Sequence, residues 1–377
     1  MTSSRSDRIA ALSPELREKL RTRMAGTAGR ADVLPTVDRD RPLPLSFAQR
    51  RLWFLDRLHP DDAEYNSALA LRLTGDLDVP ALAEALRALV ERHESLRTTF
   101  DERDGEGVQI IHPPAGLPLP VVDVDAEALD GVLLEEYSRP FDLRRGPLVR
   151  SWLGKTGPDE HVLLLCVHHI ATDGWSMGVL TGELAELYNA GVRGERAVLP
   201  PQPVQYSDFA AWQRKRLTDD VLAERLTYWQ RRLGGLAPLE LPTDRPRPPT
   251  RTTEGAVREF GLPRDTAARL AELARSGETT LFTTVLAACK VLFARYAGQE
   301  DVAVGTVVQG RDRPELQRVV GFFVNTVVLR STVDLSRSFR ELLGEVRETV
   351  LDAFSHDDVP FERLVDAVHA DRDPSRN

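Results

Sequence analysis

The sequence predicts an α/β protein of two lobes, each built from a sheet covered by helices. Segments in which apolar and polar residues alternate, as in a half-buried strand, are followed by segments with apolar residues at helical spacing. This succession runs through the chain twice, with a Pro-rich connector at residues 236–250 between the two rounds. Strands and helices that alternate in this way form layered folds with helices on the sheet faces.

The first round carries clear start signals for a helix and a strand. Ser46 and Gln49 have the spacing of a capping box, which predicts that a helix begins there. Leu69, Leu71 and Leu73 alternate with other residues, as a half-buried strand requires. Helices are expected at 79–93 and 175–189, and further strands at 108–111, 119–124, 148–153 and 162–167.

The second round repeats this outline. Strands are expected at 254–262, 302–308 and 323–329, and helices at 264–275, at 280–297 and from a capping box at Ser338 and Glu341. Ahead of both rounds, Ser13 and Pro14 predict the start of a short helix within a linker. The predicted organisation is a helical extension at 1–40, an N-terminal lobe at 41–216 and a C-terminal lobe at 217–377.

Composition excludes several classes of protein. The chain has 377 residues and a formal net charge of −9, with no concentrated basic face, so nucleic acid is not an expected partner. Its apolar stretches are too short or interrupted to span a membrane, and its first residues lack the apolar core of a secretory signal, so a cytoplasmic protein is expected. Cys166 and Cys289 lie in apolar patterns, which favours buried thiols over a disulfide or zinc site.

The most informative segment is an apolar run at 162–167 that ends in His168 and His169, followed by Asp173 and Gly174. Successive strand residues point to opposite faces, so at most one of the two imidazoles is expected to reach a substrate. Gly174 is expected to let the chain turn into the next helix. Two buried histidines with satisfied hydrogen bonds remain an alternative. A metal site is poorly supported, because an HExxH motif is absent. A serine-hydrolase triad is also disfavoured, although Gly174, Ser176 and Gly178 have the spacing of a GxSxG motif.

Seven motifs, in order, resemble those of the condensation domains of nonribosomal peptide synthetases. They are 45–55 (LSFAQRRLWFL), 92–100 (RHESLRTTF), 168–176 (HHIATDGWS), 206–213 (YSDFAAWQ), 304–311 (VGTVVQGR), 321–326 (GFFVNT) and 356–365 (HDDVPFERLV). The resemblance implies two lobes like chloramphenicol acetyltransferase, arranged as a V-shaped pseudo-dimer with a tunnel between them. It also implies that the second lobe is incomplete at its C-terminal end.

The resemblance implies an acyltransferase that forms amide bonds in the biosynthesis of secondary metabolites such as antibiotics or siderophores. Donor and acceptor peptidyl carrier proteins would bring thioesters on 4'-phosphopantetheine arms, with an adenylation domain as a neighbour. No cofactor would be bound directly. The acceptor's α-amine would attack the donor's thioester. The motif pattern also favours a donor that ends in an L-residue.

His169 is the expected catalytic group, and His168 and Asp173 stand beside it as candidates. An α-amine has a pKa of about 8 and is therefore partly neutral at cellular pH, so a strong base is unnecessary. Positioning of the two substrates is expected to matter at least as much as proton transfer. Asp173 could orient an imidazole, but a structural role at the turn is favoured. By resemblance its partner is expected to be Arg311, with Arg97 as a less favoured choice.

The remaining candidate residues fall into two groups. Gly174, Arg311 and Arg97 are expected to support the site, whereas Trp175, Ser176 and Asn325 are expected to lie near the tunnel or the substrate. The N–H groups at the start of the helix that follows Asp173 are expected to help polarise the site.

Several rivals stay open. An epimerisation domain shares HHxxxDG, although the opening motif at 45–55 resembles that of condensation domains. A heterocyclisation domain is disfavoured because it replaces the first histidine with Asp. An acyltransferase that uses acyl-CoA would not explain the other motifs. From a different class, the chain could be a non-catalytic docking module that recruits an enzyme or carrier.

Overall fold

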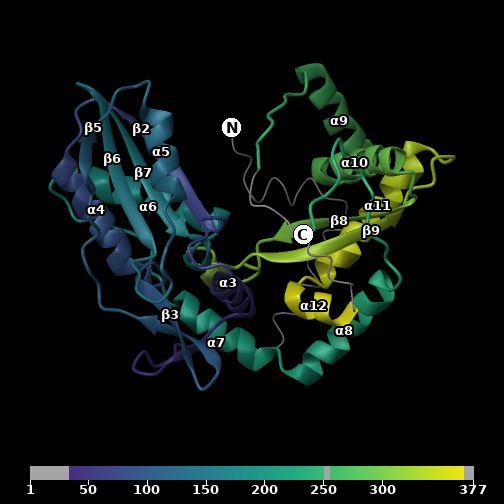
Figure 1. Ribbon diagram of the computed structural model, residues 1–377, viewed down its shortest axis with the longest axis horizontal. Helices are drawn as coiled ribbons and strands as arrows, with labels where there is room; N and C mark the ends of the chain where they lie inside the picture. Colours follow the sequence, from purple (N-terminus) through teal and green to yellow (C-terminus); the bar gives the residue numbers. More distant parts are fainter. Residues whose placement is uncertain (1–33, 250–254, 369–377) are drawn as a thin grey trace. The chain divides into compact units, whose positions relative to one another are not determined.

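A computed structural model describes residues 34–249 and 255–368 (Figure 1). These residues form two compact units. The histidine unit comprises Leu34–Leu222 together with Gln309–Asn325, and the second unit comprises the described residues of 223–308 and 326–368. The helix expected at Ser13 lies outside the described residues.

The histidine unit contains two sheets. The larger has the strand order β2 (Asn66–Thr74), β7 (Glu160–His168), β6 (Val149–Gly157) and β5 (Val121–Asp123). In it β7 runs antiparallel to β2 and β6, while β5 is parallel to β6. The smaller sheet has the order β1 (Leu43–Pro44), β4 (Glu106–Ile111) and β3 (Thr98–Arg103).

Helices complete the histidine unit. They are α3 (Phe47–Leu58), α4 (Val79–Arg92), α5 (Leu129–Ser138), α6 (Gly174–Val192) and α7 (Tyr206–Arg216), with short turns η1 (Glu94–Arg97), η2 (His169–Ala171) and η3 (Pro314–Leu316). The helix α8 (Asp219–Leu233) begins in this unit and continues into the second. Apolar side chains of α4 and α6 join those of the large sheet in one core.

Strand β7 places the histidines. Every residue from His161 to His168 is buried, because β2 and β6 flank the strand on both sides and helices cover the sheet. A near-continuous apolar sequence is what a central strand of this kind requires. The strand therefore ends with the buried His168, and His169 follows directly in η2.

The second unit is built on a two-stranded sheet of β8 (Asp301–Val308) and β9 (Asn325–Thr332). Its helices are α9 (Arg264–Ser276), α10 (Leu281–Ala297), α11 (Phe339–Ser355) and α12 (Phe361–Val368). Lys290 of α10 is fully buried and donates hydrogen bonds from Nζ to the carbonyls of Val302 (2.8 Å) and Leu329 (2.6 Å). No single helix in the described ranges is long and apolar enough to cross a membrane; α9 and α10 pass that test only as a pair bent by 105°.

Most of the expected elements are present. Both capping boxes, at Ser46 with Gln49 and at Ser338 with Glu341, are formed. The strand expected at 254–262 is wrong: residues 255–262 form no strand, and Val257 and Phe260 are 88% and 87% exposed. An extended segment becomes a strand only when a neighbour pairs with it, and apolar alternation does not report a neighbour.

The segment Gln309–Asn325 falls inside the predicted C-terminal lobe (217–377), yet it packs with the histidine unit. The described end of the predicted extension also contacts that unit. Leu34 is buried with Tyr206 and Phe323, and Arg39 pairs with Asp208 through two hydrogen bonds (2.5 and 2.9 Å). The boundaries of the two lobes stay a prediction.

Candidate functional site

The two histidines lie where β7 gives way to α6. The strand ends at His168, the turn η2 follows, and Asp173 caps α6 with Oδ1 2.8 Å from the backbone N of Ser176. The Asp173 side chain thereby satisfies one of the unpaired N–H groups at a helix start. The HHxxxDG segment is therefore a strand, a tight turn and a helix cap in succession.

His168 faces the interior. Its side chain is in ring contact with Phe141 (centroids 6.1 Å apart) and Tyr65 (6.5 Å), and its Nδ1 accepts a hydrogen bond from the backbone N–H of Ile170. Burial, and secondly the neighbouring His169, lower the pKa of His168 to about 3. His168 is thus a neutral imidazole that holds the turn, although the sequence places it among the catalytic candidates.

His169 has a different environment. The residue is half-buried, and its Nδ1 lies 2.6 Å from the carbonyl oxygen of Thr172. A carbonyl oxygen only accepts hydrogen bonds, so Nδ1 carries the proton. In the neutral ring, Nε2 therefore carries the lone pair. The phenyl ring of Phe322 lies against this imidazole, with centroids 4.8 Å apart and planes inclined by 61°.

Asp173 and Arg311 form the buried ion pair expected from the resemblance. Arg311 Nη2 lies 3.0 Å and 3.1 Å from the two carboxylate oxygens, and the side chains are 1% and 2% exposed. Asp173 also accepts from the Ser176 hydroxyl (2.7 Å) and from the backbone N–H of Phe323 (3.1 Å). Burial lowers the pKa of Arg311 and Asp173 opposes that shift. Both oxygens of the Asp173 carboxylate accept hydrogen bonds from these donors, and His169 is not one of them.

The segment that carries Arg311 needs glycine at two positions. Gly310 has φ +59°, and a Cβ there would lie 2.5 Å from the carbonyl oxygen of Phe323. A Cβ on Gly321 would lie 1.9 Å from Cδ2 of Tyr206. The guanidinium of Arg311 packs 3.9 Å above the ring of Phe323 and donates to the carbonyls of Leu316 and Val319. The loop thus closes around the guanidinium.

Two supporting residues differ from their expected roles. Gly174 is the first residue of α6, its φ lies outside the left-handed region, and a Cβ there would meet nothing within 4 Å. The turn therefore does not require glycine at this position. Arg97 donates to the carbonyl of His112 and lies 4.0 Å from Glu94, so the arginine that pairs with Asp173 is Arg311 and not Arg97.

The residues expected near the substrate divide as well. Ser176 is fully buried and bonded to Asp173, Arg311 and Gly321, so it supports the turn, and its place near a substrate stays a prediction. Its N–H is capped by Asp173 and is not free to polarise the site. Trp175 is 41% exposed and donates from Nε1 to the carbonyl of Gln317 (2.8 Å). Asn325 is half-buried at the start of β9, and its role stays a prediction.

Sequence reasoning missed Phe322, although it stands inside the quoted motif GFFVNT. It also missed Glu183, the partner of the motif at 92–100. His93 is fully buried, with Nε2 2.8 Å from the Glu183 carboxylate, and Arg92 donates to the same carboxylate at 2.9 Å. These bonds tie α4 to α6. A Glu in the otherwise apolar face of α6 was the one available signal, because a buried carboxylate needs partners.

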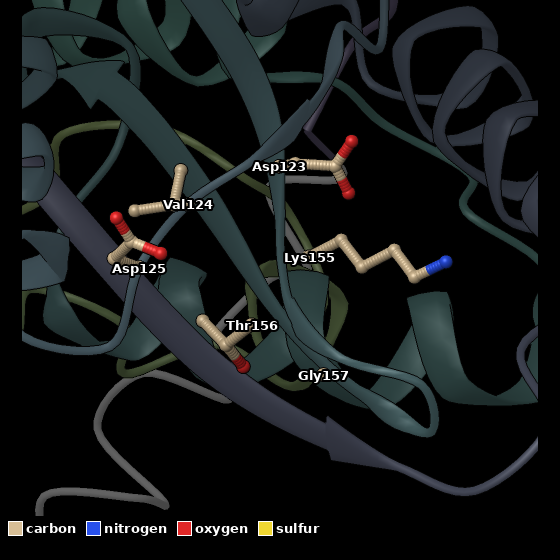
Figure 2. A pocket seen from close by; sticks show the side chains of 6 residues that line it. All are labelled: Asp123, Val124, Asp125, Lys155, Thr156 and Gly157. Carbon is tan, nitrogen blue, oxygen red and sulfur yellow. The ribbon is translucent and has the colours of Figure 1, made fainter.

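A surface hollow of about 300 Å³ lies at the other end of the large sheet, lined by Asp123, Val124, Asp125, Lys155, Thr156 and Gly157 (Figure 2). Lys155 pairs with His161, seven residues along β7 from His168. At about 3.3 Å per strand residue this is a separation of about 23 Å. The hollow is therefore not part of the histidine site.

Comparisons with known proteins agree with the motifs. The family model named Condensation domain matches residues 40–377. One of the linear gramicidin synthase proteins of Brevibacillus parabrevis is 48% identical over 355 residues, which is 92% of this chain and 5% of the synthase. The chain thus spans about a twentieth of the length of that curated relative.

Two solved structures share the α/β fold. The complex of the X-domain and OxyB from teicoplanin biosynthesis has 34% identity and a TM-score of 0.83, over 93% of this chain and 78% of that chain. The first condensation domain of the calcium-dependent antibiotic synthetase, bound to a substrate analogue, has 26% identity and a TM-score of 0.75, over 87% of this chain and 77% of that chain.

Proposed function

The chain belongs to the condensation-domain family of nonribosomal peptide synthetases, and we propose that it joins a donor acyl thioester to the α-amine of an acceptor aminoacyl thioester through an amide bond. Both substrates would be held on the phosphopantetheine arms of peptidyl carrier proteins, with an adenylation domain as a neighbour.

His169 would act through Nε2. The acceptor nitrogen attacks the thioester carbonyl carbon, so a C–N bond forms and a tetrahedral intermediate results. Nε2 accepts the proton that the nitrogen loses, the C–S bond breaks, and the proton passes to the departing thiolate. Because an α-amine with a pKa of about 8 is partly neutral at cellular pH, the imidazole needs only moderate basicity.

The surroundings of His169 suit this modest task. The Thr172 carbonyl holds the tautomer that leaves Nε2 free to accept. Asp173 is engaged by Arg311, Ser176 and the backbone of Phe323, so it would stabilise the turn and not the imidazolium. Catalysis would then rely mainly on holding two tethered substrates in an attack geometry.

The observation that carries the proposal is the half-buried His169 with its Nδ1 fixed 2.6 Å from Thr172 O. The test compares wild type with His169→Ala, using a donor-loaded and an acceptor-loaded carrier, and measures the amide product by mass spectrometry. Removal of a general base typically costs about 10²- to 10⁴-fold, and a loss in this range is expected. Unchanged turnover would contradict the proposal.

Two rivals give different results in the same experiment. Exchange of the donor's α-proton without amide formation would identify an epimerisation domain. The docking alternative is favoured by one observation, that the related X-domain is seen in complex with OxyB. If docking is the function, neither wild type nor His169→Ala forms amide, and both bind the partner equally well.

A further inference from the structure

The hydrogen bond from Nδ1 fixes the tautomer of His169 but not the plane of its ring. The imidazole plane is set by rotation about the Cβ–Cγ bond, which has broad energy wells, and a single hydrogen bond to Thr172 O at 2.6 Å tolerates a range of donor angles. Rotation within that range would swing Nε2 away from an attacking amine. The Phe322 ring, with its centroid 4.8 Å from that of His169, lies against one side of the imidazole. A second constraint on the ring plane is therefore present.

Phe322 is itself held from two directions. Its side chain is half-buried and packs against the main core of the histidine unit. Its carbonyl accepts a hydrogen bond from the hydroxyl of Tyr206. On either side, Gly321 N–H donates to Ser176 Oγ (3.1 Å) and Phe323 N–H donates to Asp173 Oδ2 (3.1 Å). The backbone is thus fixed at three consecutive residues.

The Tyr206 hydroxyl is part of a directed chain of hydrogen bonds. Ser46 Oγ accepts from the backbone N–H of Gln49 (3.0 Å) and lies 2.8 Å from the Tyr206 hydroxyl. Because the tyrosine hydrogen goes to the carbonyl of Phe322, the serine must donate to the tyrosine oxygen. The start of α3 is connected in this way to the residue that touches His169.

We infer that Phe322 is a positioning residue for His169, and that Tyr206 acts through it. This inference rests on the proposed function of His169. Phe322 would restrict the imidazole to the plane in which Nε2 points outward, while Tyr206 would keep the Phe322 backbone in place. The fully buried Tyr206 ring also occupies the space next to Gly321.

The kinetic test uses Phe322→Leu, which keeps an apolar side chain but removes the flat ring. Small misplacements of a reacting group can cost about 10²-fold, so a fall in kcat of about tenfold or more is expected, with KM for both loaded carriers unchanged. Phe322→Tyr keeps the ring and should restore kcat to within about threefold of wild type. Tyr206→Phe removes only the hydroxyl and should lower kcat in the same direction, by less.

The matched control is Phe141→Leu. Phe141 contacts His168 as Phe322 contacts His169, with centroids 6.1 Å apart, so the control removes an equivalent ring from the other imidazole. It should lower thermal stability and leave kcat per folded molecule near that of wild type. An equal fall in kcat for Phe141→Leu and Phe322→Leu would overturn the inference.

A second readout does not depend on turnover. NMR of the histidine side chains should show the His169 ring protons shifted by the phenyl ring, with Nδ1 protonated and Nε2 not. Phe322→Leu should remove that shift and broaden the signals as the ring rocks, whereas Phe141→Leu should not. Unchanged His169 signals in Phe322→Leu would overturn the inference.

The two measurements separate the inference from the proposed function. If wild type forms no amide but the His169 signals respond to Phe322→Leu, the proposed function fails and the positioning contact stands. If Phe322→Leu does not fold, Tyr206→Phe takes its place in both measurements.

Discussion

His168 and His169 are adjacent in sequence and have opposite surroundings. His168 is 4% exposed, lies between Tyr65 and Phe141, and has its pKa lowered to about 3. His169 is half-buried, and the bond from its Nδ1 to a carbonyl leaves the lone pair on Nε2. The end of β7 and the start of η2 therefore place side by side a buried imidazole that stabilises the turn and a half-buried one with its lone pair on Nε2.

The difference extends to the rest of the motif. Asp173 and Ser176 belong to the buried side with His168, since both are bonded within the Arg311 cluster. Gly174 and Trp175 are exposed, as the outward side requires. Substitutions on the buried side should therefore reduce stability first, and those on the outward side should reduce activity first.

The largest effect on stability is expected from Arg311→Met, which leaves the Asp173 carboxylate buried without its cation. Breaking a buried pair by removing one partner costs about 3–5 kcal/mol, so the unfolding free energy should fall by that amount. Urea denaturation monitored by circular dichroism measures it. Activity should disappear together with stability.

The matched control is Arg330→Met in the second unit. Arg330 also binds an aspartate through two nitrogens, at 2.9 Å and 2.6 Å from Asp301, but the side chains are 21% and 38% exposed. Ion pairs in contact with solvent contribute about 0–1 kcal/mol. Arg330 also donates to two backbone carbonyls, as Arg311 does, so the two substitutions remove the same kinds of bond. Equal losses for the two arginines would show that burial does not set the difference.

The next largest expected effect is a dependence of the unfolding free energy on pH that comes from His168. The pKa of His168 is about 3 in the folded chain and 6.5 ordinarily, so between these values the unfolded chain binds more protons than the folded one. Stability should therefore fall as pH falls from 6.5 toward 3, with a slope of about 1.4 kcal/mol per pH unit from this residue. His168→Gln should have a shallower slope by that amount in urea denaturation at several pH values.

His93 titrates in the same direction, because burial lowers its pKa, although Glu183 opposes the shift. It is present in both proteins of the comparison, so its contribution cancels in the difference between the slopes. Identical slopes for wild type and His168→Gln would mean that His168 is not held neutral by burial.

Local features were predictable from the sequence because their partners are close in the chain. The capping boxes at Ser46 and Ser338 each use a residue three positions away, and both are formed. The apolar run of β7 predicts a central strand for the same reason. The strand expected at 254–262 failed because its pairing depended on a neighbour that no local pattern specifies.

Contacts between distant residues needed more than local reasoning. The pairing of Asp173 with Arg311 spans 138 residues, and it was expected only through the family resemblance. The contact between His169 and Phe322 spans a similar length and was missed, since a Phe in an apolar motif predicts core packing and nothing more specific. The segment Gln309–Asn325 carries both contacts, and its place in the histidine unit follows from the three-dimensional fold.

The smallest effect on stability is expected from Gly174→Ala, on the outward side of the turn. Neither backbone nor space requires glycine there, because φ lies outside the left-handed region and a Cβ would meet nothing within 4 Å. The unfolding free energy should stay within about 0.5 kcal/mol of wild type, as for most exposed substitutions. Gly321→Ala, whose Cβ would meet the Tyr206 ring, should lose about 1–3 kcal/mol, as overpacked cores do. Equal losses of unfolding free energy for the two variants in urea denaturation would contradict the division into a buried and an outward side. A loss of turnover in Gly174→Ala at unchanged stability would show that glycine is needed there to leave space for a substrate.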